Sequence, residues 1–242
     1  MKISGSRAFR HLNSGCKFLG LSLLSRLLIK AFFFDIDGTI LDSATDICSS
    51  ILAACSLAQK PEVSEGVLRR YIGRSLAETF AEIYPGSSEN EIERLCLLYR
   101  EQYRERAHRG TRVFPGIQEM LAALPGLKST ATTKSSATTA LVLELFGLRR
   151  HFDHVQGSDN GRYKPDPTIL LEAAEALKVR PEQCLMIGDA PVDMEAGRRA
   201  GMLTCAVGWG YGDRAELRSW HPDFWIDNPS DLVAIAQRLT LR

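Results

Sequence analysis

The chain has 242 residues, of which 45% are hydrophobic, enough for one large domain or for one domain with a smaller insertion. Its formal net charge of +1 gives no reason to expect a nucleic acid or a charged membrane surface as a partner. The six cysteines are scattered, form no C-x-x-C motif and have no histidine at zinc-site spacing. This usage favours a reducing compartment, and we expect a cytoplasmic protein.

The first 30 residues differ in charge from the rest, because they hold six of the 30 basic residues and none of the 29 acidic ones. Their apolar run at 18–29 is interrupted by Arg26 and is too short to span a bilayer, so we expect no stable membrane insertion. No A-x-A-like cleavage site precedes residue 31. We predict a flexible extension over 1–30; a transit peptide and a mis-assigned start codon stay open as alternatives.

A short apolar run at 31–34 leads directly into Asp35 and Asp37, and Gly38 and Thr39 follow. The pattern predicts a buried strand whose carboxyl end carries a site, because ligands of open α/β sheets bind at that end. Two carboxylates at the end of a buried strand need a cation or another positive group nearby. The alternative is a strand followed by an ordinary Asp-Gly turn.

Residues 43–112 lack the alternation of strands and show helical periodicity instead. We predict four helices here, at about 43–60, 64–72, 75–84 and 88–108. They would form a small all-α insertion directly after the first strand.

From Phe114 onwards, strand patterns alternate with helix patterns, which is typical of a parallel sheet with crossover helices. Strands are predicted at 127–132, 154–156, 183–187, 203–207 and 224–226. Helices are predicted at 115–124, 136–146, 167–177, 190–200 and 229–239. The sequence therefore predicts an α/β fold.

Three of the predicted strands end in polar side chains: Asp35 and Asp37, Thr132 to Lys134, and Asp189. Asp193 lies four residues after Asp189, on the same face of the following helix. Because the carboxyl ends of parallel strands meet at one edge of a sheet, we expect these groups to converge. Three carboxylates at one point favour a hard cation such as Mg²⁺. Lys164, in a loop before a helix, would add a positive charge, although each residue alone also has an ordinary structural explanation.

Four segments resemble, in order, the motifs of the haloacid dehalogenase-like hydrolase superfamily: DIDGT at 35–39, STATTKS with Thr132, GRYKPDP with Lys164, and GDAPVD at 188–193. The segments AGRRAGM (196–202) and VGWGYG (207–212) resemble its phosphoglycolate phosphatase branch. The resemblance covers about 31–240. It implies a Rossmann-like parallel sheet core over 31–42 and 113–242, with a small all-α cap over 43–112.

The resemblance also implies a mechanism. Asp35 would attack phosphorus and become an aspartyl-phosphate. Asp37 would protonate the leaving alcohol and then activate the water that hydrolyses the intermediate. Mg²⁺ would be bound by Asp35, by the backbone carbonyl of Asp37 and by Asp189. Asp193 would support these ligands without binding the ion itself. An acid at position 37 favours an oxygen leaving group, because that oxygen needs a proton.

The same resemblance assigns residues to the substrate. Thr132 and Lys164 would hold the phosphoryl oxygens in a loose transition state. Gly38 and Thr39, together with Thr133, would complete the phosphate-binding loop. Thr133 departs from the branch, which usually has Asn at this place.

Arg74 in YIGRSL is a second departure, because a hydrophobic residue or proline is common there. It follows Gly73, which suits a tight turn between two cap helices. We predict that Arg74 binds a second anionic group on the substrate, such as a carboxylate.

These inferences predict a Mg²⁺-dependent phosphomonoesterase, a monomer or homodimer, that acts on a small phosphorylated metabolite, with 2-phosphoglycolate as the first candidate. The alternatives within the family are a broader sugar-phosphate or nucleotide phosphatase, a pyrophosphatase and a β-phosphoglucomutase-like enzyme. A protein of this fold that only binds a phosphorylated ligand or a partner is the alternative outside enzymes.

Overall fold

The computed structural model describes residues 28–240, so nearly all of the predicted N-terminal extension lies outside the described part. The first described residues already contact the body of the protein. The Ile29 side chain is buried, and the Lys30 N–H donates to the Gln183 carbonyl at 2.8 Å. Among the described helices, none is long and apolar enough to cross a membrane.

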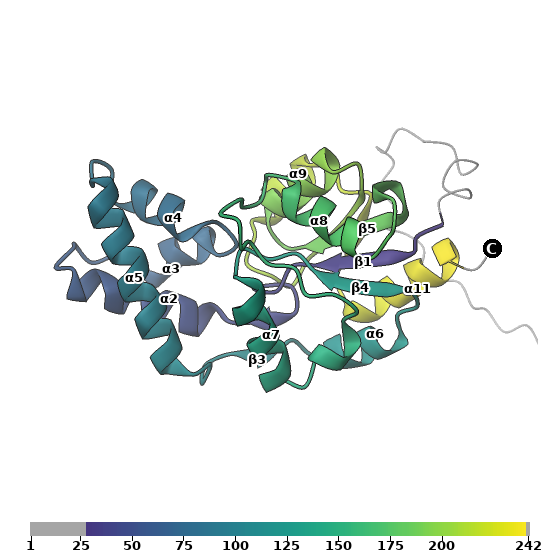
Figure 1. The fold of residues 1–242 in the computed structure, drawn as a ribbon, viewed down its shortest axis with the longest axis horizontal. Helices are drawn as coiled ribbons and strands as arrows, with labels where there is room; N and C mark the ends of the chain where they lie inside the picture. The colour runs from purple at the N-terminus through teal and green to yellow at the C-terminus, as the bar shows by residue number, and fades with distance from the viewer. Residues whose placement is uncertain (1–27, 241–242) are drawn as a thin grey trace, which may run out of the picture.

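The body of the protein is built on one parallel sheet of five strands in the order β4-β1-β5-β6-β7 (Figure 1). The strands are β1 (Ala31–Phe34), β4 (Leu127–Thr130), β5 (Cys184–Gly188), β6 (Leu203–Val207) and β7 (Phe224–Ile226). All four residues of β1 are buried, as expected for a central strand covered on both faces. The predicted Rossmann-like α/β fold is confirmed.

Helices cover both faces of the sheet, and the alternating side chains of β1 separate the two cores. Phe32 and Phe34 pack with α6 (Ile117–Ala123), α7 (Ser136–Leu145) and α11 (Pro229–Thr240). Ala31 and Phe33 face the other side, toward α8 (Thr168–Ala176) and α9 (Pro191–Arg199). Figure 1 shows the two layers of helices on either side of β1. A short helix, α10 (Arg214–Ser219), follows β6.

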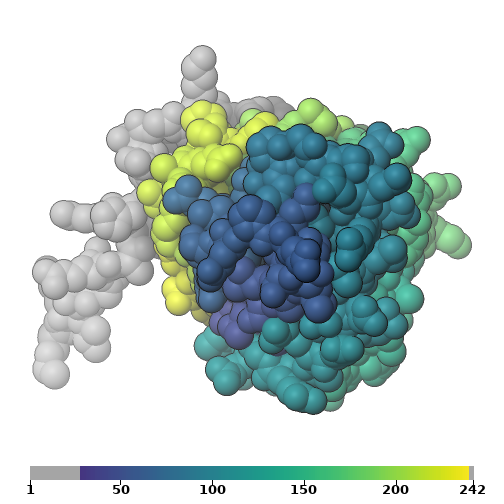
Figure 2. Space-filling model, turned by 90° about the vertical axis from the view of Figure 1, so that its left-hand side faces the viewer, coloured from purple at the N-terminus to yellow at the C-terminus, as the bar shows by residue number. Residues whose placement is uncertain are grey.

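Residues 43–112, which we call the cap, are helical and have a core of their own. The helices are α2 (Ala44–Leu57), α3 (Glu65–Leu68), α4 (Leu76–Ile83) and α5 (Glu89–Arg106). The predicted helix at 64–72 is shorter than expected and continues as a 3₁₀ turn, Arg69–Tyr71. Ser88 and Glu91 form a capping box that starts α5. Figure 2 shows the face of the molecule that the cap, in blue to teal, presents to solvent.

The chain enters and leaves the cap through a small antiparallel ribbon, which the sequence did not predict. It consists of β2 (Leu41–Asp42) and β3 (Arg112–Val113), with Leu41 opposite Val113. Asp46 reinforces it by accepting hydrogen bonds from the Gly110 N–H and from the Thr111 hydroxyl. Strands of two residues are too short to give a periodic signal, which explains why the ribbon was missed.

Three other strand predictions differ from the structure, although β5 (Cys184–Gly188) is displaced by only one residue from the prediction. The segment 154–156 makes only an isolated bridge between Ser129 and His154, and is not a strand of the sheet. β4 ends at Thr130, two residues earlier than predicted, although the Ala131 N–H still donates to the Phe34 carbonyl at 2.8 Å.

Candidate active site

The loop after β1 is shaped around the side chain of Asp189. The Asp35 N–H still donates to the Ile187 carbonyl at 2.9 Å, so Asp35 continues the pairing of the sheet. The chain then turns at Gly38, whose φ is +91°. A Cβ atom at Gly38 would lie 2.2 Å from the Asp189 carboxylate, so this position has room only for glycine.

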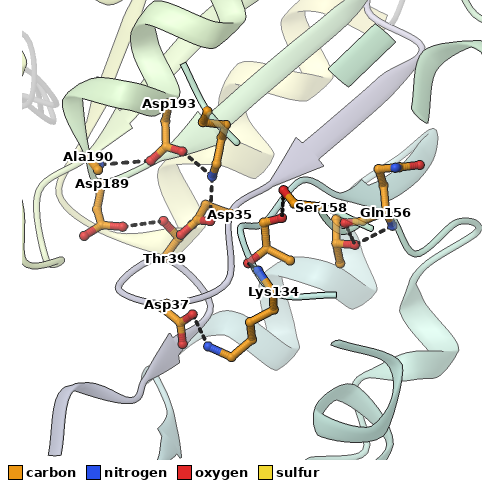
Figure 3. A network of polar contacts seen from close by, with 12 residues as sticks. Asp35, Asp37, Thr39, Lys134, Gln156, Ser158, Asp189, Ala190 and Asp193 are labelled. Carbon is orange, nitrogen blue, oxygen red and sulfur yellow. Dashed lines mark hydrogen bonds and ion pairs between the residues drawn. The ribbon is translucent and has the colours of Figure 1, made fainter. Parts of the chain in front are cut away.

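Three buried aspartates meet at the carboxyl edge of the sheet. One carboxylate oxygen from each of Asp35, Asp189 and Asp193 lies within 4.8 Å of the others. Asp189 accepts hydrogen bonds from the Thr39 hydroxyl at 3.0 Å and from the Tyr211 N–H at 2.8 Å. All three side chains offer only oxygen, which suits a hard divalent cation. Figure 3 shows this cluster beside the end of β1.

Lys164 brings a positive charge into the acidic cluster. Its buried ammonium lies 2.7 Å from an Asp35 oxygen and 2.5 Å from an Asp193 oxygen. Burial alone would lower the pKa of Lys164, but the Asp193 and Asp35 carboxylates outweigh it and raise the pKa. Burial, with the neighbouring carboxylates, also raises the pKa of Asp35 and Asp189. One ammonium cannot neutralise three carboxylates, and the donor set therefore fits a bound divalent cation.

Asp37 lies apart from the acidic cluster, although it is only two residues from Asp35. Its carboxylate forms an ion pair with Lys134 and accepts a hydrogen bond from the Ser43 hydroxyl at 2.5 Å. Figure 3 shows Asp37 and Lys134 facing each other, away from Asp193 and Asp189. Burial alone would lower the pKa of Lys134, but Asp37 outweighs it and raises the pKa.

The residues predicted from the end of β4 lie close to this pair. Thr132 is fully buried, and its carbonyl accepts a hydrogen bond from the Ser158 hydroxyl at 3.1 Å. Thr133 lines a cavity whose wall also includes Asp37 and Lys134. The structure therefore brings the polar ends of β1, β4 and β5 to one edge of the sheet.

Arg74 lies farther out, in the wall of the same cavity, and its guanidinium already pairs with another side chain. It contacts both carboxylate oxygens of Glu82, at 3.0 and 3.1 Å, and lies over the ring of Tyr71. Its side chain is 39% exposed. A substrate carboxylate would have to compete with Glu82 for this guanidinium.

Tyr211, which the sequence did not assign to the site, connects the acidic cluster with the cap. Its N–H donates to Asp189, and its hydroxyl accepts the Ser43 and Ala44 N–H groups at 2.7 and 3.0 Å. The same hydroxyl donates to Asp42 at 2.7 Å. The VGWGYG segment was the only signal for this residue, and it gave no indication of which groups Tyr211 would contact.

Comparison with known proteins places the chain in a family. The family described as haloacid dehalogenase-like hydrolase matches residues 32–207, which is more than half of the chain. A phosphoglycolate phosphatase from Aquifex aeolicus is 32% identical over 211 residues, covering 86% of this chain and 96% of that protein. The pyrophosphatase PpaX of Bacillus cereus is 32% identical over 215 residues, covering 87% and 98%.

Two solved structures have a fold similar to that of this chain. A haloacid dehalogenase-like family hydrolase from Streptococcus pneumoniae has a TM-score of 0.77 at 26% identity, covering 86% of this chain and 98% of that one. A predicted phosphatase from Clostridium acetobutylicum shares the fold, with a TM-score of 0.80 at 24% identity over 86% and 98% of the two chains. The chain belongs to the haloacid dehalogenase-like hydrolases.

Proposed function

We propose that the protein is a Mg²⁺-dependent phosphatase that hydrolyses monoesters of small phosphorylated metabolites through a phosphoaspartate on Asp35. The observation that carries the proposal is the buried cluster of Asp35, Asp189 and Asp193 with Lys164, next to a second and separately held acid, Asp37. Phosphoryl transfer to a carboxylate requires a nucleophile, a cation that offsets the charge of the phosphoryl oxygens, and an acid for the leaving group. This arrangement of side chains can supply the nucleophile, the oxygen ligands for the cation and the acid.

In the first step, an oxygen of Asp35 forms a bond to phosphorus while the bond to the leaving oxygen breaks. The electron pair of that bond goes to the leaving oxygen, which takes a proton from the carboxyl group of Asp37. In the second step, Asp37 takes a proton from water, whose oxygen attacks phosphorus and releases the Asp35 carboxylate. The products are the alcohol and inorganic phosphate.

Other residues of the cluster would position these groups. Asp35, the backbone carbonyl of Asp37 and Asp189 would hold Mg²⁺, which supplies positive charge for the phosphoryl oxygens when it is bound. Asp193 holds Lys164 in place by its hydrogen bond, and Lys164 with Thr132 would contact the phosphoryl group. Amide groups near Gly38 and Thr133 would complete the anion site, while the Gly38 N–H itself donates to the Leu41 carbonyl at 2.8 Å.

Two substrates deserve the first tests because relatives carry their names: 2-phosphoglycolate and pyrophosphate. A carboxylate on the substrate would have to displace Glu82 from Arg74, whereas pyrophosphate has no carboxylate to place there. Comparison of kcat/KM for these two compounds, with wild-type protein and Arg74→Ala, distinguishes them. A selective loss with 2-phosphoglycolate would support the predicted role of Arg74.

The test of the chemistry is the substitution Asp35→Asn, measured with p-nitrophenyl phosphate and Mg²⁺. An amide cannot attack phosphorus, so we expect kcat to fall by at least about a thousandfold. Asp166→Asn is the matched control, because this half-buried aspartate accepts hydrogen bonds from Thr168 and contacts none of the clustered carboxylates, and it should leave kcat unchanged. Residual activity of Asp35→Asn within about tenfold of wild type would refute the mechanism.

We also propose a cytoplasmic location. The five cysteines within residues 28–240 are all free, which suits a reducing compartment.

A further inference from the structure

A cavity of about 810 Å³ lies between the cap and the core, and Asp37 and Lys134 form part of its wall. Its volume is in the range of pockets that enclose drug-sized ligands, about 300–1,000 Å³. A two-carbon substrate such as 2-phosphoglycolate would fill only a small part of it. Because Asp37 is the acid that meets the leaving oxygen in the proposed mechanism, the cavity lies where the leaving group would extend.

One wall of the cavity is apolar and exposed. Leu141 and Leu145 are one turn apart on α7, and their exposed fractions are 73% and 60%. They are the two most exposed large hydrophobic side chains in the described part of the chain, and both line the cavity. Exposed apolar side chains that gather at a concave site indicate contact with a ligand.

Aromatic rings from the cap and from the core complete the lining. Tyr99 and Tyr103 stand on α5 with their rings stacked, 5.5 Å apart at an interplanar angle of 16°. Tyr71 and Tyr163 line the cavity from the cap and from the loop of Lys164. Burial raises the pKa of both Tyr99 and Tyr103.

The charges of the lining favour an anionic compound. Asp37 is the only acidic residue in the wall, and Lys134 neutralises it. Arg100 and Arg104, on successive turns of α5, also line the cavity, and neither guanidinium has an ion-pair partner among residues 28–240. A dianionic phosphate ester would be attracted to such a cavity.

We propose that this phosphatase also hydrolyses phosphate monoesters of alcohols that carry a ring or a branched hydrocarbon, with that apolar part held against Leu141 and Leu145. The proposal rests on the proposed function, and it extends the range of leaving groups beyond small acids. Bond changes and proton transfers are those of the mechanism above, with the ring-bearing alcohol as the leaving group.

The test compares ethyl phosphate with 2-phenylethyl phosphate, because both release an alkyl alcohol and differ mainly in apolar bulk. Wild-type protein should prefer 2-phenylethyl phosphate by about tenfold or more in kcat/KM. The double substitution Leu141→Ser/Leu145→Ser should bring this ratio close to one and leave ethyl phosphate unchanged. Leu97→Ser on α5, 56% exposed and absent from the lining, is the control and should keep the preference.

Two outcomes would overturn the inference. Equal kcat/KM for the two esters with wild-type protein would show that no leaving-group pocket exists. Equal losses on both esters in the double variant, or a change of oligomeric state in size-exclusion chromatography, would show that the two leucines serve cap closure or a subunit interface instead.

Calorimetry with ethylphosphonate and 2-phenylethylphosphonate separates this inference from the proposed function, because phosphonates are not hydrolysed. If no ester is turned over but the phenylethyl compound binds about tenfold more tightly, the pocket stands and the proposed chemistry fails. If both phosphonates bind equally well, the pocket is refuted even when hydrolysis is observed.

Discussion

Asp35 and Asp37 are two residues apart, yet their carboxylates pair with different lysines. Asp35 lies with Lys164 in the buried acidic cluster, whereas Asp37 pairs with Lys134 and accepts a hydrogen bond from Ser43. The proposed nucleophile and the proposed acid are thereby kept in different electrostatic surroundings, as the two proposed tasks would require. This separation depends on Lys134, which the sequence placed among the polar groups at this edge without naming Asp37 as its partner.

Lys134→Met should leave the Asp37 carboxylate without its cation. A carboxylate that stays buried after its partner is removed has lost its hydration without gaining an ion pair. We therefore expect the free energy of unfolding to fall by about 3 kcal/mol. Urea denaturation measures this change. Lys60→Met, which removes a lysine from an ion pair with the exposed Glu91, is the control and should lower the free energy of unfolding much less, because solvent screens this pair.

Combining Lys134→Met with Asp37→Asn tells whether charge is the cause. The double variant should recover part of the lost stability, because no unpaired carboxylate remains. If the double variant is as unstable as Lys134→Met alone, the loss comes from packing of the lysine side chain.

A second prediction tests the contact between Gly38, in the loop after β1, and the proposed cation site. Gly38→Ala would place a methyl group on the Asp189 carboxylate. The apparent affinity for Mg²⁺ should therefore fall by about tenfold or more, which is the usual effect of changing a residue that contacts a metal ligand. Gly86→Ala is a close control. Gly86 has nearly the same φ, +92°, but no neighbouring atom within 4 Å. Mg²⁺ titration of activity should separate the two variants, and equal affinities would show that the loop moves aside.

At the scale of elements, the sequence predicted the sheet well and its junction with the cap poorly. β1, β6 and β7 have the predicted bounds, because each is a compact apolar run between clear breaks. The β2–β3 ribbon gave no signal, since its strands have two residues each. The contacts of Lys134 with Asp37 and of Tyr211 with Ser43 join residues 97 and 168 positions apart. Only the folded chain reveals such pairs.

Tyr211→Phe tests the link between the VGWGYG loop and the start of α2. Without the hydroxyl, the N–H groups of the buried Ser43 and Ala44 lose their acceptor, and we expect a loss of about 1–3 kcal/mol in unfolding free energy. Hydrogen exchange should become faster at these two amides. Tyr84→Phe, whose hydroxyl donates to the Pro61 carbonyl at the surface, is the control. Unchanged exchange at both amides would mean that water replaces the hydroxyl.

At the scale of the whole molecule, the carboxyl edge of the sheet concentrates buried negative charge that the folded chain alone does not neutralise. Asp35, Asp189 and Asp193 share one ammonium, and burial raises the pKa of Asp35 and Asp189. A divalent cation that binds the folded state there should therefore stabilise the entire domain, not only the reaction.

The melting temperature should accordingly rise with Mg²⁺ and fall in EDTA. At a Mg²⁺ concentration of about 100 times Kd, the stabilisation amounts to about 2.7 kcal/mol. Asp189→Asn should abolish most of this dependence, whereas Asp213→Asn at the start of α10 should keep it. If the melting temperature of the wild-type protein is the same with Mg²⁺ and with EDTA, the proposed cation site is contradicted. Zn²⁺ should substitute poorly in activity assays, because the site offers no nitrogen or sulfur.

The β2–β3 ribbon has a consequence for how such enzymes diversify. It brings the two ends of the cap side by side, with Asp42 opposite Arg112. A segment attached in this way can lengthen, shorten or be exchanged without a change of register in β1, whose end carries Asp35. Because both ends of the cap are held at this one place, we expect that the cap can be replaced by a segment of another length while the end of β1 keeps its position.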